Sequence, residues 1–166
     1  MTIEQHCIFE TGYGWMGLAG SHAGISRVIL PQLSADKVLD LLNAREDQID
    51  KDAFGDLPLR LQQYFEGNVV DFSDELDLSG ATGFQINVWL ATQAIPNGQT
   101  QSYGWIADSI GKPNAARAVG QALKANPIPI LIPCHRVVSG NGGLGGYRGG
   151  IDMKQTLLSI ENSNRL

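Results

Sequence analysis

The sequence predicts an α+β protein of two domains, residues 1–80 and 81–166. The first domain begins with short apolar segments separated by glycines, a pattern typical of hairpin-linked strands, and the second has apolar residues at helical spacing. The charge also divides the chain, because residues 1–82 have a net charge of −9 and residues 83–166 have a net charge of +4. This asymmetry favours an acidic half that aids solubility and a basic half that meets an anion. Uneven surface charge without a function is the alternative.

Three strands and two helices are expected in the first domain. The strands lie around residues 8–9, 15–18 and 25–30, with Pro31 ending the third. Ser34 caps a helix that carries Val38, Leu41 and Leu42 on one face. A second helix runs from Pro58 to Phe65, with Leu61, Tyr64 and Phe65 inward. Gly67 ends the second helix. The acidic stretch 69–78 is predicted to be an extended, solvated linker edge and not a metal site.

Three helices are expected in the first half of the second domain. The first contains Phe84, Val88 and Ala91 and stops at Pro96-Asn97-Gly98, the second is capped by Ser102 and closed by Gly111, and the third begins at Ala115 with Asn114 as its cap. The short connection between the last two predicts a helix-turn-helix. Arg117, Gln121 and Lys124 recur on one face of the third helix, so this polar stripe is expected to point outward. An alanine-rich packing helix without a ligand is the alternative.

The tripeptide Pro133-Cys134-His135, followed by a glycine-rich loop from Gly140 to Gly150, is the strongest sign of an active site. It places a nucleophile beside an acid–base residue, held by a proline and close to flexible backbone. A thiol with a pKa of about 8.5 is a weak nucleophile at neutral pH, so Cys134 needs a base that converts it to the thiolate. A buried structural cysteine is the alternative.

The composition argues against several other classes of protein. No apolar run approaches the roughly 20 residues that span a membrane, and the chain starts without a secretory pattern, so we expect a cytoplasmic or nuclear protein. Cys7 and Cys134 lie 127 positions apart, and we expect free thiols and no disulfide. Near Cys7 the sequence offers only His6 and His22 as further ligands, so no metal site is expected.

Seven short segments of the second domain carry a resemblance to a known family. They are Thr100–Gly104, Lys112–Gly120, Asn126-Pro127, Ile132–Val138, Gly146–Gly150, Leu157-Leu158 and Glu161. In this order they resemble the O6-alkylguanine-DNA alkyltransferases, or methylated-DNA–protein-cysteine methyltransferases. In residues 1–80 the resemblance is only architectural, to the ribonuclease-H-like α/β domain that such proteins carry. The resemblance implies that residues 81–166 form a mostly helical DNA-binding and alkyl-acceptor domain.

This resemblance also implies that Cys134 accepts an alkyl group from O6 of a damaged guanine. His135 then acts as the base through a bridging water, Glu161 orients the imidazole, and Tyr103 donates to N3 of the guanine. Asn126 ties the recognition helix to the active-site turn. The base pocket is expected to be lined by the backbone carbonyls of Cys134 and Val137, the ring of Tyr147 and the backbone N–H of Arg148.

A guanine in a duplex must leave the base stack before its O6 can reach a protein thiol. By resemblance, the third helix lies in the minor groove of double-stranded DNA, and Arg117 enters the duplex in place of the flipped base. Ala115, Ala116, Ala118 and Gly120 are expected to permit close approach to DNA, and Gln121, Lys124 and Arg136 are the further expected DNA contacts. Arg148 stands where some relatives carry a small residue, so its side chain is expected to reach a phosphate or to cover the pocket.

Together these features predict a monomeric DNA repair protein, associated with the nucleoid in a bacterium, that needs no cofactor and no metal and acts once per molecule. The expected group is methyl or a small alkyl, and activity on O4-alkylthymine stays open. Three alternatives remain. A thiol hydrolase using Cys134 and His135 would turn over many times, a non-repairing DNA-binding or regulatory module would not need Cys134, and a structural protein would not gather these residues at one site.

Overall fold

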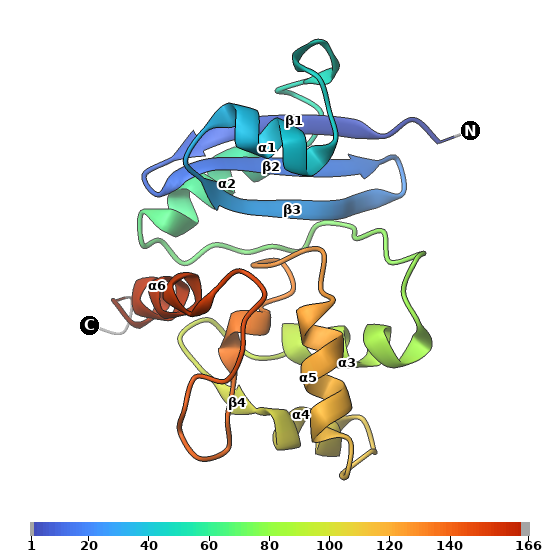
Figure 1. Ribbon diagram of the computed structural model, residues 1–166, viewed down its shortest axis with the longest axis vertical. Coiled ribbons are helices and arrows are strands. Elements are labelled where there is room, and N and C mark those ends of the chain that lie inside the picture. The colour runs from blue at the N-terminus through green and yellow to red at the C-terminus, as the bar shows by residue number, and fades with distance from the viewer. Residues whose placement is uncertain (1, 164–166) are drawn as a thin grey trace. The chain divides into compact units, whose positions relative to one another are not determined.

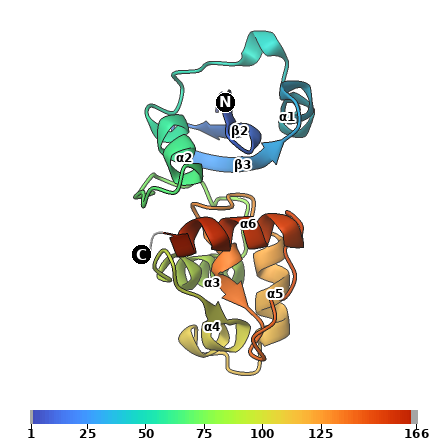
Figure 2. The same cartoon turned by 90° about the vertical axis from the view of Figure 1, so that its left-hand side faces the viewer.

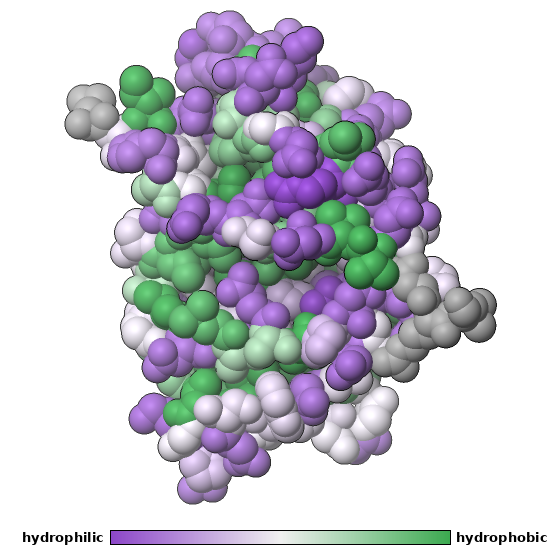
Figure 3. All heavy atoms as spheres, turned by 180° about the vertical axis from the view of Figure 1, so that it is seen from behind, coloured by the Kyte–Doolittle hydropathy of each residue, from purple (hydrophilic) through white to green (hydrophobic). Residues whose placement is uncertain are grey.

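The computed structural model describes residues 2–163, and the chain divides into two compact units between Leu78 and Ser79 (Figure 1). Helices and small sheets are both present, which confirms the α+β class. No helix in the described part of the chain has the length and apolar character that a membrane span requires. On the face in Figure 3, apolar side chains lie among polar ones, as on most folded proteins.

The first unit is built on a three-stranded antiparallel sheet in the order β1 (Gln5–Thr11), β2 (Gly14–Ser21) and β3 (Gly24–Gln32). The glycine that ends each hairpin turn has a positive φ, 130° at Gly14 and 129° at Gly24. A Cβ atom on Gly14 would lie 2.5 Å from a carbonyl oxygen of β3. Only glycine fits this turn without strain.

The third strand continues through Pro31 to Gln32, so the predicted end at Leu30 is wrong. A register shift between Trp15 and Gly17 of β2 lies opposite this part of β3. Because β3 is at the edge of the sheet and its register is irregular there, the N–H that a proline lacks is not needed.

Two helices cover the sheet, and Figure 2 shows α1 (Ala35–Leu42) and α2 (Leu57–Phe65) on opposite sides of it. A short 3-10 turn, η1 (Glu46–Gln48), lies between them in sequence. The Ser34 side chain caps α1 by accepting a hydrogen bond from a backbone N–H, as predicted. Gly67 follows α2 with a φ of 96°, which confirms its predicted place at the helix end.

The buried face of α1 consists of Val38, Leu39 and Leu42. Leu41 is 41% exposed, so its predicted place on this face is wrong. Val38 and Leu42 pack with Ala19 of β2, and the 3.6-residue period then turns Leu39 inward and Leu41 to the rim. On α2, the inward positions of Leu61, Tyr64 and Phe65 are as predicted.

The acidic stretch before the unit boundary is more ordered than a solvated linker edge. Ile25 N donates to Glu75 O at 2.9 Å and Asp77 N donates to Ile25 O at 2.8 Å, so the stretch pairs with the start of β3. The Asp74 carboxylate binds both terminal nitrogens of Arg60 at 2.9 and 2.6 Å. These contacts fix the stretch to the sheet and to α2.

The second unit is mostly helical, with one two-stranded parallel sheet. Its elements are α3 (Gly83–Gln93), β4 (Gln101–Ser102), α4 (Tyr103–Ser109), α5 (Ala116–Lys124), the 3-10 turn η2 (Cys134–Arg136), β5 (Val137–Val138) and α6 (Ile151–Asn162). Ser102 caps α4 and Gly111 follows it with a φ of 74°, both as predicted.

The helix that carries the polar stripe is α5, and it begins one residue later than predicted. Its N-cap is Ala115, so the prediction that Asn114 caps it is wrong. Ala115 N donates to Lys112 O at 2.9 Å, and this tight turn still contains Asn114. The buried face of α5 consists of Val119, Ala122 and Leu123.

The stripe itself is confirmed, because Arg117, Gln121 and Lys124 are all exposed. Trp89 Nε1 of α3 donates to Ala122 O at 2.9 Å and fixes the opposite side of α5. The orientation of α5 in the unit is therefore set by a buried hydrogen bond as well as by apolar packing.

We predict that Arg60→Met lowers the free energy of unfolding by about 2 kcal/mol at neutral pH, because two hydrogen bonds to Asp74 are lost at a partly buried site, together with those to Asp56 Oδ1 and Asp71 O. Arg60 holds the pKa of Asp74 below its ordinary value, through its hydrogen bond and then its charge, against the effect of burial. A carboxyl whose pKa is lower when folded stabilises the fold above its unfolded pKa of about 3.9 and loses this effect as the pH falls. The variant should therefore show a smaller loss of stability between about pH 5 and pH 3 in urea titrations.

Arg45→Met is the matched control, since the Arg45–Asp47 pair is 73% and 70% exposed. Water screens such a pair, so its removal should leave the urea midpoint unchanged. Equal effects of the two substitutions would contradict a structural role for the Arg60–Asp74 pair.

Candidate active site

Cys134 lies at the start of the η2 turn, with its backbone fixed on both sides. Cys134 N donates to Ile132 O at 2.8 Å, and Arg136 N donates to Pro133 O at 2.9 Å. Just before the turn, Ile130 is buried with a φ of 73°, a conformation that a β-branched residue seldom adopts. Surrounding structure therefore imposes the shape of this segment.

Asn126, at the end of α5, joins that helix to the cysteine. Its Nδ2 donates to Cys134 Sγ at 3.2 Å and to Ile132 O at 2.9 Å, and its Oδ1 accepts from Ile128 N at 2.9 Å. One buried amide thus fixes the segment between α5 and η2 and supplies a hydrogen bond to the sulfur.

Behind Cys134 lies a buried charged network. His135 Nε2 is 2.7 Å from Glu161 Oε1, and both side chains are at most 1% exposed. Arg136 donates hydrogen bonds to the same carboxylate from Nε and Nη2 at 2.9 to 3.2 Å, and its Nη1 donates to Ile95 O at 2.7 Å. Gly98 N also donates to the carboxylate, at 3.4 Å. Glu161 of α6 is thereby tied to η2 and to the turn after α3.

The surroundings set the protonation states of this network. Burial opposes ionisation of Glu161, but the hydrogen bonds from His135 and Arg136 hold its pKa at about 2, so it stays a carboxylate. Burial lowers the pKa of His135 and outweighs the opposing effect of Glu161, which favours a neutral ring able to accept a proton. Burial also raises the pKa of the Cys134 thiol, against the Asn126 hydrogen bond. At rest the site therefore holds a protonated thiol at Cys134 and a neutral imidazole at the next residue.

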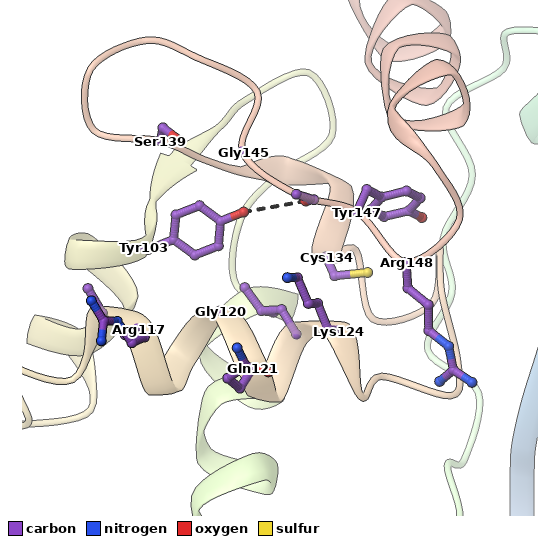
Figure 4. A pocket seen from close by; sticks show the side chains of 13 residues that line it. Tyr103, Arg117, Gly120, Gln121, Lys124, Cys134, Ser139, Gly145, Tyr147 and Arg148 are labelled. Atoms are coloured by element: carbon purple, nitrogen blue, oxygen red, sulfur yellow. Dashed lines mark hydrogen bonds between the residues drawn. The ribbon is translucent and has the colours of Figure 1, made fainter.

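A cavity of about 310 Å³ opens over Cys134 (Figure 4). One side is formed by α5, with Arg117, Gln121 and Lys124 in a row, and the other by Tyr103 and the loop after β5. Tyr147 has a buried hydroxyl, and burial and then the nearby Cys134 raise its pKa well above the ordinary value. A protonated phenol therefore lies beside the thiol.

Glycine is required where the loop meets Tyr103. Gly145 has a φ of 72°, and a Cβ atom there would lie 2.5 Å from the Tyr103 hydroxyl oxygen. The same hydroxyl donates to Gly146 O at 3.4 Å. The close approach of backbone and ring forms one wall of the cavity.

Comparison with known proteins identifies the family. The model of the 6-O-methylguanine DNA methyltransferase DNA binding domain matches residues 83–163. A methylated-DNA–protein-cysteine methyltransferase of Methanosarcina acetivorans is 39% identical over 158 residues, covering 95% of this chain and 98% of that protein. One of Mycolicibacterium paratuberculosis is 54% identical over 109 residues, 66% of each chain. The crystal structure of Mycobacterium tuberculosis O6-methylguanine methyltransferase aligns with a TM-score of 0.82 at 39% identity, covering 99% of this chain and 96% of that one.

The chain belongs to the methylated-DNA–protein-cysteine methyltransferase family. A second solved structure, Mycobacterium tuberculosis OGT in complex with DNA, aligns with a TM-score of 0.80 at 42% identity and covers 96% of this chain and 93% of that one. The family resemblance found in the sequence is confirmed, and DNA is the partner that the family implies.

The structure brings most of the residues expected from the methyltransferase motifs to one place. Those that line the cavity are Tyr103, Ala116, Arg117, Gly120, Gln121, Lys124, Cys134, Tyr147 and Arg148. Asn126, His135 and Glu161 are buried, and Asn126 donates to Cys134 Sγ. Ala115 and Ala118 are not among the residues that line the cavity. Val137 is fully buried, and its carbonyl oxygen accepts a hydrogen bond from Lys154 Nζ at 2.7 Å.

The Arg136 side chain points to buried protein groups and not to the surface where a DNA contact was expected. Its side chain is 11% exposed, and its guanidinium is held by Glu161 and Ile95 O. All three nitrogens of this guanidinium donate to protein acceptors, so the structure gives it the task of holding Glu161. The sequence contains no sign of this pairing, because the two residues are 25 positions apart.

Some residues of the site were not singled out in the sequence. Ser139 and Leu123 line the cavity without having been expected there, whereas Gly145 and Gly146 belong to the glycine-rich loop that the sequence marked. Lys154 is fully buried in α6. Its spacing was a usable signal, because Lys154 shares a helix face with Leu157 and Glu161 at three and seven residues.

We predict that Arg136→Met lowers the free energy of unfolding by about 3 kcal/mol, because it leaves the buried Glu161 carboxylate with fewer donors. Duplex binding by the folded variant should keep the salt dependence of the parent protein. Lys124→Met is the comparison, and we expect removal of this exposed cation of α5 to reduce the slope of log K against log salt by about one. A reduced slope for Arg136→Met with unchanged stability would instead support the expected contact between Arg136 and DNA.

Proposed function

We propose that Cys134 accepts a methyl or small alkyl group from O6 of guanine in double-stranded DNA, once per molecule. Family membership shows the general activity, which is DNA repair by alkyl transfer from DNA to a protein cysteine. The observation that carries the assignment to this residue is the position of Cys134, between a buried acid–base network and a cavity edged by cations. Cys7 of the first unit is also buried, but burial and then Asp50 and Asp52 raise its pKa to about 11.

The chemistry follows from the hydrogen bonds. A bond forms between Cys134 Sγ and the alkyl carbon as the bond from that carbon to O6 breaks, and the electron pair of the broken bond remains on the guanine. The thiol proton passes to His135, directly or through a water, and must use Nδ1 because Nε2 is bound to Glu161. Glu161 then stabilises the imidazolium.

The departing guanine carries the negative charge that the transition state develops. We propose that Tyr103 donates its hydroxyl hydrogen to N3 of the guanine ring, in exchange for its hydrogen bond to Gly146 O, which supports a donor at this wall of the cavity. Such donation stabilises the transition state more than the ground state, because the ring becomes anionic as O6 loses the alkyl group. The thioether formed has no leaving group, so the transfer is irreversible.

The exposed face of α5 is the proposed DNA contact. Arg117 and Lys124 present positive charge beside the cavity, and Gly120 lets another surface come close. We propose that α5 enters the minor groove and that Arg117 takes the place of the guanine that rotates into the cavity. Arg148 is exposed at the cavity rim, where it is available to a backbone phosphate.

One chain supplies every residue of the proposed site, so we propose that the protein acts as a monomer. Its substrate places it with DNA, at the nucleoid in the cytoplasm of a bacterium or archaeon. A thiol hydrolase is the second candidate, favoured by the Cys134–His135 pair, and it differs in turning over repeatedly.

Mass spectrometry of the intact protein and of its proteolytic peptides, after mixing with an O6-methylguanine duplex, tests which residue is the nucleophile. We expect one methyl group per molecule, located on the peptide that contains Cys134, and no further transfer with excess DNA. Cys134→Ser should take no methyl group and should still bind the duplex, because an alkoxide is much harder to form than a thiolate. Cys7→Ala is the matched control and should take one methyl group; repeated turnover would favour the hydrolase.

The role of Arg117 is tested by comparing two substrates. We predict that Arg117→Ala slows repair of O6-methylguanine in a duplex by about tenfold or more, because unstacking costs a few kcal/mol. Its reaction with free O6-alkylguanine base, which needs no unstacking, should change little. Gln121→Ala, on the same face, should leave the ratio of the two rates unchanged. If Arg117→Ala slows both substrates equally, the residue does not assist base rotation.

A further inference from the structure

Lys154 is the buried cation that the proposed chemistry does not use. It lies in the first turn of α6, where the helix dipole disfavours a positive charge, and its side chain is fully buried. Burying an ammonium group is costly unless acceptors replace its water. A lysine in this position therefore needs a structural reason.

The acceptors are three backbone carbonyls from two different segments. Lys154 Nζ donates to Val137 O of β5 at 2.7 Å, to Gly146 O at 3.2 Å and to Leu144 O. These three carbonyls accept from all three N–H donors of the ammonium group. The lysine thus joins the strand that follows the cysteine turn to the loop on either side of Gly145.

The loop depends on these contacts for its position at the cavity. Its first part is held internally, because Ser139 N donates to Gly143 O at 2.9 Å. Over residues 144–146, the hydrogen bonds that the structure describes run to Lys154 and to the Tyr103 hydroxyl. Gly145 and Gly146 form the cavity wall in this segment, and glycines lose more conformational freedom on ordering than other residues.

We propose that Lys154 is a positioning residue that holds the glycine-rich loop against β5, so that the wall of the base cavity is formed before a guanine enters. The proposal rests on the proposed function. A wall that is already ordered removes a conformational cost from base binding, whereas a loose wall lowers the fraction of molecules able to bind. Lys154 thereby acts on substrate capture and not on the transfer step.

Single-turnover alkylation of Lys154→Met at varied concentrations of free O6-methylguanine base separates the two steps. We expect the half-saturating concentration to rise about tenfold or more, with the limiting rate within about threefold of the parent. Gln155→Met, an exposed neighbour on α6, is the matched control and should behave as the parent. A lower limiting rate at an unchanged half-saturating concentration would overturn the proposal.

Two further measurements separate positioning from an effect of the ammonium charge on the thiolate. In the absence of substrate, amide hydrogen exchange of residues 143–147 should speed up in Lys154→Met while exchange in α5 stays unchanged. The rate at which iodoacetamide modifies Cys134 should fall only slightly. The Lys154 charge lowers the pKa of the thiol less than the hydrogen bonds of Asn126 and Tyr147 do, and this small reagent needs no base cavity. Slower modification with unchanged loop exchange would assign Lys154 to activation of the thiol and overturn the proposal.

Lys154→Gln keeps two donors without the charge and serves if the methionine variant does not fold. It should give intermediate loop exchange and an intermediate half-saturating concentration, and parent-like values for both would contradict the proposal. Failure of the proposed function has a different signature. In that case the parent protein takes no methyl group, whereas the exchange measurement still tests what Lys154 holds.

Discussion

The buried carboxylate of Glu161 is the contact on which the second unit depends. It receives hydrogen bonds from Arg136 and Gly98 and lies 2.7 Å from His135 Nε2, so α6, the cysteine turn and the turn after α3 meet at one charged group. A buried carboxylate is stable only when donors surround it. The geometry of the site and the assembly of the unit therefore have the same origin.

The two sides of Cys134 have different tasks. Behind it, burial lowers the pKa of His135, so the ring is neutral at rest, and its Nε2 lies 2.7 Å from the Glu161 carboxylate. In front, the cavity wall is made of backbone from a loop rich in glycine, which permits the close approach to Tyr103. Asn126 follows α5 and donates to Cys134 Sγ, so the helix with the exposed polar stripe and the cysteine share one hydrogen-bonded residue.

Two buried cations of the second unit donate to fixed protein groups in place of water. Arg136 is satisfied by a carboxylate and one carbonyl, and Lys154 by three carbonyls. Neither side chain is available to DNA, although a count of charge in the sequence assigns both to the basic half. The cations that face the cavity are those of α5 and Arg148.

Local patterns in the sequence determined a large part of this protein. Cys134 and His135 are adjacent, Ser34 and Ser102 cap helices within three residues of their partners, and the exposed stripe of α5 follows from helical period. The motifs of the second domain also indicated the family, and comparison with known proteins confirmed that the chain belongs to it.

Tertiary structure decided what depends on distant partners. Arg136 points to Glu161, 25 residues away, and Lys154 to carbonyls that have no side-chain signature. Leu39 of α1 lies inward because the sheet beneath the helix sets the centre of its buried face. Asn114 does not cap α5, because the turn before that helix extends one residue further than predicted, to Ala115. Sequence periodicity specifies which residues share a face, but burial and hydrogen-bond partners are set by segments that meet only in the fold.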